Sequence, residues 1–145
     1  MVLADKRDYR QGYKKHYTTY KRLQSTNDDV QSRRLLLVYS VECGLKYLLL
    51  DTWHVESPET ILCGTDEKRK KVLTTHNLET ILKELGQQGT FRFPHLTTVH
   101  RDSITTENYH QLYRYCVRLK EKDKNSESIY EDELRKVADW IEEGM

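Results

Sequence analysis

The sequence predicts an all-α fold, with four to five helices packed as a bundle in a single domain that spans residues 1–145. Three observations favour this fold class. The chain holds only 6 Gly and 2 Pro, which disfavours a sheet protein rich in turns. Charged residues make up 32% of the chain and hydrophobic residues 37%, a balance typical of long amphipathic helices. The segment 39–50 carries apolar residues on all sides of a helix, as the central helix of a bundle does.

A first helix is predicted over residues 6–24, where tyrosines recur at helical spacing at Tyr9, Tyr13, Tyr17 and Tyr20. We expect this stripe to face the core, with its hydroxyl groups at the rim. Arg and Lys residues occupy the other faces, and basic side chains beside aromatic rings also bind nucleic acids through charge and stacking. That second interpretation stays open for this helix.

A second, long helix is predicted from Val30 to about His54, after a segment rich in N-cap residues. It carries Glu42 and Lys46 inside its apolar run. Their spacing places the two charges one turn apart on one face, so each offsets part of the other's burial cost. We interpret them as a structural charge pair that specifies the bundle. The alternative is that they orient catalytic groups on another helix.

Three shorter elements follow. Ser57 and Pro58 fit the N-cap and the first position of a short helix. Residues 64–71 are predicted to form a charged loop. Thr75 is expected to cap a third helix, which Gly86 ends.

The last third of the chain begins with residues 87–102, which have no helical period. We predict an irregular connection there, long enough to carry function. Ser103 is expected to cap a fourth helix with core-facing residues as far as Leu119. Ser128 and Glu131 have the spacing of a capping box and predict the start of the last helix.

Charge is distributed unevenly along the chain, although the net charge is only +1. Residues 1–40 hold nine Lys and Arg against four Asp and Glu, and residues 121–145 hold four against nine. The two ends could attract each other within the bundle or present opposite faces to partners. Solvated helix faces are the plainer explanation.

The spacing of the cysteines and the lack of a long uninterrupted apolar segment indicate the cellular location of the protein. Cys43, Cys63 and Cys116 are widely spaced, which signals neither a disulfide framework nor a zinc site. The first residues lack the apolar stretch of a signal peptide, and charges interrupt the longest apolar run. We therefore expect a cytoplasmic protein with no membrane association, no metal and no cofactor.

Three short motifs carry a family resemblance. Glu42 and Lys46 lie on a long helix, Thr-His-Asn-Leu at 75–78 opens a later one, and Tyr-Arg-Tyr stands at 113–115. Together they resemble the HEPN superfamily of helical bundles, over roughly residues 30–120. The resemblance implies metal-independent RNA cleavage in prokaryotic antiphage-defence or toxin–antitoxin systems, often by a dimer. Nuclease members share an Arg followed after four to six residues by His, and in the later part of this sequence none of Arg92, Arg101 and Arg114 is followed by His at that spacing.

Two functional hypotheses follow from the resemblance. The first is an RNA-directed domain, either a divergent endoribonuclease or a member that has lost catalysis. The alternative is a non-catalytic assembly, scaffold or nucleotide-sensing subunit of a larger defence complex, which binds protein through exposed tyrosines and charged ends. The expected partners are RNA and either a second copy of the chain or a larger protein.

Cleaving RNA without a metal requires groups that move protons and a cation beside the phosphate. His110 and Arg114 are the catalytic candidates, since they lie one turn apart on the predicted fourth helix. Arg118 extends the same line as an RNA-binding candidate. A solvated helix face would explain this line equally. His76 is expected to be structural, since it stands just inside a helix start.

A second group of candidates lies in the irregular connection. Arg92, His95 and Arg101 are predicted to bind RNA, because loops often carry binding residues. No Gly-rich phosphate loop occurs in the sequence, which argues against nucleotide hydrolysis.

Overall fold

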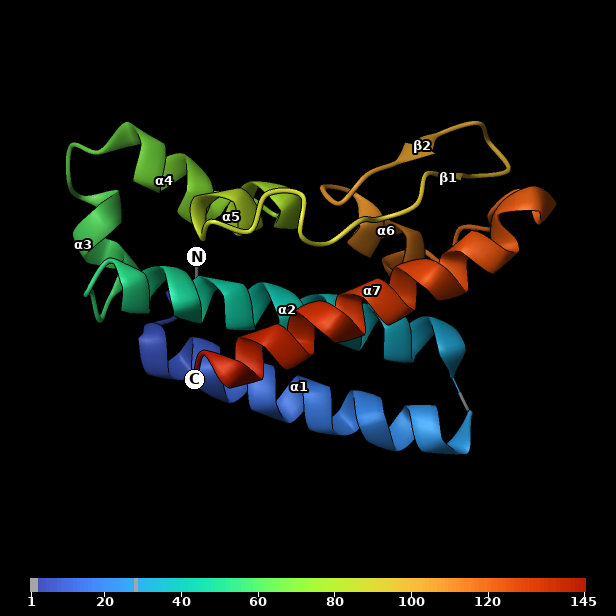
Figure 1. Ribbon diagram of the computed structural model, residues 1–145, viewed down its shortest axis with the longest axis horizontal. Helices are drawn as coiled ribbons and strands as arrows, with labels where there is room; N and C mark the ends of the chain where they lie inside the picture. Colours follow the sequence, from blue (N-terminus) through green and yellow to red (C-terminus); the bar gives the residue numbers. More distant parts are fainter. Residues whose placement is uncertain (1–2, 28) are drawn as a thin grey trace.

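The computed structural model describes residues 3–27 and 29–145, and this part of the chain is mostly helical. Three long helices form its body: α1 (Lys6–Thr26), α2 (Val30–Thr52) and α7 (Lys124–Glu143) (Figure 1). The shorter elements are α3 (Pro58–Leu62), α4 (Glu67–Thr74), α5 (Leu78–Glu84), β1 (Leu96–Thr97), β2 (Ser103–Ile104), α6 (Tyr109–Arg114) and the 3-10 helix η1 (Glu121–Asp123). The predicted helical class is confirmed, but the described residues form seven α-helices instead of four to five, and one small antiparallel hairpin departs from an all-α fold.

Helix α1 begins with a capping box, in which the side chains of Asp5 and Asp8 accept hydrogen bonds from each other's backbone N–H groups. Tyr13, Tyr17 and Tyr20 are buried, so the predicted core face of this helix is confirmed, but the hydroxyl groups of Tyr13 and Tyr20 are buried as well and do not lie at the rim. The hydroxyl group of Tyr13 donates a 3.0 Å hydrogen bond to a backbone carbonyl of α7. The tyrosines therefore join α1 to α7 as well as to α2.

Helix α2 is the central element, as its all-round apolar sequence predicts. It packs against α1, α5, α6 and α7, and its buried residues lie on every side. At Gly44 the approach of α7 is so close that a Cβ atom would lie 2.8 Å from Ile141. A larger residue there would overpack the junction of the two helices.

A buried ionic cluster ties α2 to α7 and α1. The Glu131 carboxylate accepts hydrogen bonds from Arg33 Nε at 3.2 Å, Arg34 Nε at 2.8 Å and the Tyr20 hydroxyl at 2.6 Å. Arg34 also pairs with Glu127. Burial raises the pKa of Glu131, but the hydrogen bonds from Arg33, Tyr20 and Arg34 outweigh it, so the pKa falls below its ordinary value.

Two sequence predictions about the middle of the chain are wrong. The expected charged loop contains most of α4, which begins where the Asp66 side chain accepts a hydrogen bond from the Arg69 N–H. Helix α5 is capped by Asn77 instead of Thr75, because the Asn77 side chain accepts from Glu79 N–H. Local capping chemistry decides both boundaries.

Helix α6 is shorter than the sequence predicts. Ser103 lies in β2, where it pairs with β1, and Leu119 forms a β-bridge with Thr98. The apolar residues at both ends of the expected helix therefore belong to the hairpin region. Helix α7 begins at Lys124, so Glu131 is an interior residue and not part of a capping box.

The structure holds one large hydrophobic core and a smaller cluster around Leu50, Ile61 and Leu73. Within residues 3–27 and 29–145, no helix is both long and apolar enough to cross a membrane.

Candidate functional site

Glu42 and His76 meet on one side of α2. His76 lies in the turn before α5, and its Nδ1 atom is 2.7 Å from Glu42 Oε1. Asn77 fixes this turn, since its side chain caps α5 and accepts a 2.6 Å hydrogen bond from the Thr106 hydroxyl. Because a carboxylate can only accept, Nδ1 carries the proton in this contact. The Nε2 atom of His76 is thereby left to interact with another group.

His110 joins the pair from α6. Its ring centroid is 5.5 Å from that of His76, and the two rings are tilted by 50°. The neighbouring residues Tyr109, Leu112 and Tyr113 are buried and anchor α6 against α2 and α7. His110 itself stays partly exposed on the side of α6 that faces His76.

The surroundings of His110 favour its neutral form. Partial burial, the neighbouring His76 and the Arg114 cation lower the pKa of His110, and the Glu42 carboxylate only partly opposes them. The imidazole is therefore neutral near pH 7 and able to accept a proton.

Two cations border this group. Lys46 is buried, and its Nζ atom lies 4.0 Å from Glu42 Oε2, so the predicted charge pair exists in the folded chain. Arg114 is exposed, one turn after His110, and acts on it electrostatically. We call Glu42, Lys46, His76, His110 and Arg114 the histidine cluster.

The histidine cluster is open to solvent, which a binding site requires. The His76 side chain is 61% exposed, while that of Glu42 is 20% exposed. A carboxylate that orients one imidazole, a second neutral imidazole and a free guanidinium together suit proton transfer beside a phosphate.

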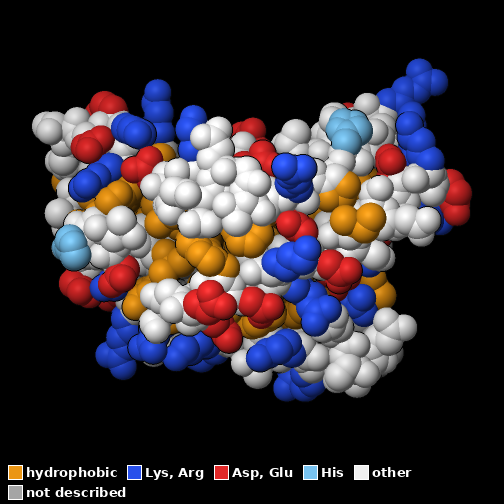
Figure 2. Space-filling view, viewed as in Figure 1, with side chains coloured by type: hydrophobic (Ala, Val, Ile, Leu, Met, Phe, Trp, Pro, Cys, Tyr) orange, Lys and Arg blue, Asp and Glu red, His pale blue; other side chains and the backbone are white. Residues whose placement is uncertain are grey.

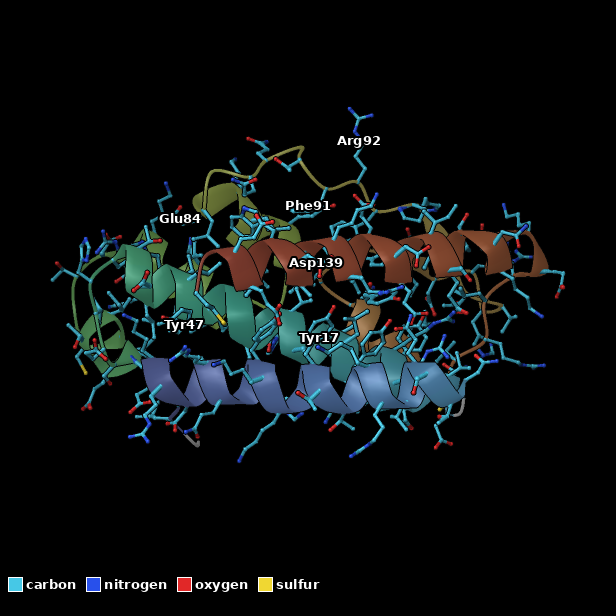
Figure 3. The ribbon with its side chains drawn as sticks, turned by 60° about the horizontal axis from the view of Figure 1, so that its bottom comes forward. Tyr17, Tyr47, Glu84, Phe91, Arg92 and Asp139 are labelled. Atoms are coloured by element: carbon cyan, nitrogen blue, oxygen red, sulfur yellow. The ribbon has the colours of Figure 1, made fainter. Side chains whose placement is uncertain are left out.

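The other predicted RNA-binding residues lie elsewhere. Arg118 is beyond the end of α6 and lines a separate cavity with Gln31 and Glu127, so it does not continue the line of His110 and Arg114. Arg92 extends away from the helices (Figure 3). His95 and Arg101 are exposed residues of the hairpin region. None of these four residues forms a hydrogen bond or an ion pair with the histidine cluster.

The sequence prediction treated His76, like Glu42 and Lys46, as structural. Its turn is indeed ordered by capping, as expected, but its side chain reaches Glu42, which is 34 residues away in the chain. A signal in the sequence was the position of His76 within one of the three HEPN-like motifs.

Among the described residues, no group of three or more His, Cys, Asp or Glu side chains is arranged to hold a metal ion. No protein-family model, curated protein or solved structure matches the chain. The resemblance to the HEPN superfamily therefore stays a prediction carried by the three motifs.

Proposed function

We propose that the chain is a divergent HEPN-type endoribonuclease domain that cleaves RNA without a metal. The observation that carries this proposal is the meeting of Glu42, His76 and His110, which come from three separate segments of the sequence. Those segments are the HEPN-like motifs and their immediate neighbours, and Arg114 of the third motif stands beside His110.

The chemistry assigns a role to each member. Neutral His110 takes the proton from a ribose 2′-hydroxyl, and the 2′-oxygen attacks the adjacent phosphorus. The bond from phosphorus to the 5′-oxygen breaks, and protonated His76 gives that oxygen a proton. The products are a 2′,3′-cyclic phosphate and a free 5′-hydroxyl.

Arg114 and Glu42 support this reaction in different ways. The Arg114 guanidinium stabilises the charge that develops on the phosphate oxygens. Glu42 is a positioning residue, because its carboxylate holds the His76 ring through Nδ1. The setting proposed for this activity, from the resemblance alone, is prokaryotic antiphage defence or a toxin–antitoxin system.

The test incubates the purified chain with tRNA and total RNA in EDTA and follows the appearance of 2′,3′-cyclic phosphate ends. We expect His76→Ala and His110→Ala each to lower the cleavage rate by about 10²-fold or more. His54→Asn is the matched control, since His54 is an exposed histidine beyond the end of α2. Cleavage that survives both alanine variants would contradict the assignment.

The second candidate function is a non-catalytic assembly subunit. Arg7, Arg10, Lys14 and Lys21 share one exposed side of α1, and none forms an ion pair with a described residue. Lys and Arg side chains gather over this helix along the lower edge of Figure 2. Such a face suits an acidic protein partner.

The tyrosines of α1 are not part of that face, because Tyr13, Tyr17 and Tyr20 are buried. This corrects the expectation that exposed tyrosines bind a partner. The assembly hypothesis therefore predicts that Lys14→Glu weakens co-purification with the product of a neighbouring gene, while cleavage is absent in every condition. A chain that remains monomeric beside each neighbour's product would argue against it.

A further inference from the structure

Tyr115 is an exposed aromatic residue next to the histidine cluster. It is 65% exposed, more than any other large hydrophobic side chain among the described residues. The long tyrosine stripe of α1 is buried in the core, so the exposure of Tyr115 is not a general property of this chain's tyrosines. An aromatic ring left in water beside a cleft is typical of a binding site.

The end of α6 holds Tyr115 in this position. Val117 N–H donates to the Leu112 carbonyl and Cys116 N–H to the Tyr113 carbonyl, which is the hydrogen-bond pattern of a Schellman motif. Cys116 takes the left-handed conformation, with φ 51°, that this motif requires. The chain turns away there, and Tyr115 remains at the helix end.

A cleft of about 440 Å³ lies beside the Tyr115 ring. Leu112, Val117 and Ile104 supply apolar surface, and Gln111 lines the same cleft together with the polar residues Thr98, Ser103 and Asn108. Gln111 and Tyr115 are one helical turn apart and so share a face of α6. A cleft that offers an exposed aromatic ring, some apolar surface and several polar side chains suits a flat heteroaromatic ring that carries polar atoms on its rim.

Arg114 connects this cleft to the histidine cluster. Its guanidinium carbon lies 5.7 Å from the centroid of the Tyr115 ring, and the same cation acts on His110. A polynucleotide could therefore place a phosphate at Arg114 and an adjoining base beside Tyr115. Asp102 also lines the cleft, and its negative charge favours the base there over the phosphate.

We propose that Tyr115 and Gln111 form a nucleobase subsite for single-stranded RNA, in which a base stacks on Tyr115 and its polar edge contacts the Gln111 amide. The inference deepens the proposed ribonuclease function and rests on it. A base can enter this cleft only when it is unpaired, because the stack must be opened for an aromatic side chain to take its place. The subsite therefore selects single strands and loops over duplex RNA.

The experiment measures binding of a short single-stranded RNA with 2′-O-methyl groups, which cannot be cleaved by attack of the 2′-oxygen. One adenine is replaced by 2-aminopurine, whose fluorescence falls on stacking. We expect the wild-type chain to quench the probe. Tyr115→Ala should weaken binding about tenfold and abolish the quenching, whereas Tyr115→Phe should preserve both.

Two further variants separate stacking from general surface effects. Ile129→Ala is the matched control, since Ile129 is a 54% exposed apolar side chain of α7, and it should leave binding unchanged. Gln111→Leu should keep the quenching but reduce the preference among bases at the probed position.

The results distinguish this inference from the proposed function. Quenching that depends on Tyr115 without any RNA cleavage would uphold the subsite and contradict the ribonuclease. Cleavage that depends on His76 and His110, with equal binding by wild type and Tyr115→Ala, would overturn the subsite alone. A chain that binds no single-stranded RNA would overturn both.

Discussion

The chain contains two clusters of charged and polar side chains that differ in what surrounds them. In the cluster of Arg33, Arg34 and Glu131, every member is buried, and the carboxylate accepts four hydrogen bonds from Arg33, Arg34 and Tyr20. In the histidine cluster, His76 is mostly exposed and has a hydrogen-bond partner at Nδ1 only. The Glu131 carboxylate of the first cluster is fully hydrogen-bonded within the protein, whereas the Nε2 atom of His76 in the second cluster remains available to another group.

This contrast separates side chains that stabilise the fold from side chains that are available to a ligand. A buried charge without a partner is costly, so the Glu131 cluster tolerates no missing member and has no free group for a ligand. His76 and Arg114 of the histidine cluster are exposed to solvent, where losing one side chain costs little folding energy. Its unused nitrogen atoms and the exposed Arg114 remain able to contact a substrate.

The largest expected effect comes from breaking the buried cluster. Glu131→Ala leaves two buried guanidinium groups facing each other, and we expect the free energy of unfolding to fall by about 3–5 kcal/mol. His76→Ala is the comparison and should change it by no more than about 0.5 kcal/mol. Urea denaturation followed by circular dichroism measures both. Equal losses in the two variants would refute the contrast between the clusters.

The next effect concerns the open cluster and rests on the proposed ribonuclease activity. Glu42→Gln leaves His76 without the carboxylate that orients it, so cleavage should slow by about tenfold, less than the ~10²–10⁴-fold contributed by proton transfer itself. The pH profile of cleavage should shift at the same time, because the Glu42 charge acts on His110. A slower rate with an unmoved profile would show that Glu42 supports the fold only.

Acid should affect the buried cluster through Glu131. The pKa of Glu131 is lowered in the folded chain from an ordinary value of 4.5, so the unfolded chain binds the proton more tightly. The stabilisation is present above about pH 4.5 and is lost as the pH falls through the folded-state pKa, with a slope of up to about 1.4 kcal/mol per pH unit. Glu131→Gln should remove this part of the pH dependence in denaturation curves recorded between pH 6 and pH 3, which is about the range of carboxyl titration.

The smallest expected effect is a change in the titration of His110. Its pKa lies below the ordinary 6.5, so protonation disfavours the folded state and stability falls as the pH drops below that value. Proton NMR of the His110 ring should show that low pKa. It should rise in His76→Ala and Arg114→Gln and fall in Glu42→Gln. A value at or above 6.5 in the wild-type chain would contradict the described environment.

Much of the fold could be predicted from local patterns. The tyrosine stripe predicted the buried face of α1, and the apolar run around Glu42 and Lys46 predicted the central helix α2. The extent of α6 could not be predicted in the same way. Its apolar residues have helical spacing, but Leu119 is used by a β-bridge, and such pairing depends on a distant strand.

The candidate site shows the same limit. His110 and Arg114 were identified as catalytic candidates, and Glu42 and Lys46 as a structural charge pair, from type and spacing along single helices. His76 was not, because its approach to Glu42 depends on how α5 packs against α2. The exposure of Tyr115 likewise follows from the end of α6, which the sequence pattern placed too late.

The helical class, the central position of α2 and the burial of the α1 tyrosines could be predicted from the amino-acid sequence alone, because each depends on how apolar residues are distributed around a single helix. Two features could be seen only in the folded chain. Glu131 completes a buried cluster, and Glu42, His76 and His110 form a cluster that is open to solvent. Contacts between segments far apart in the chain depend on how those segments pack. The spacing of residues within a single segment does not specify that packing.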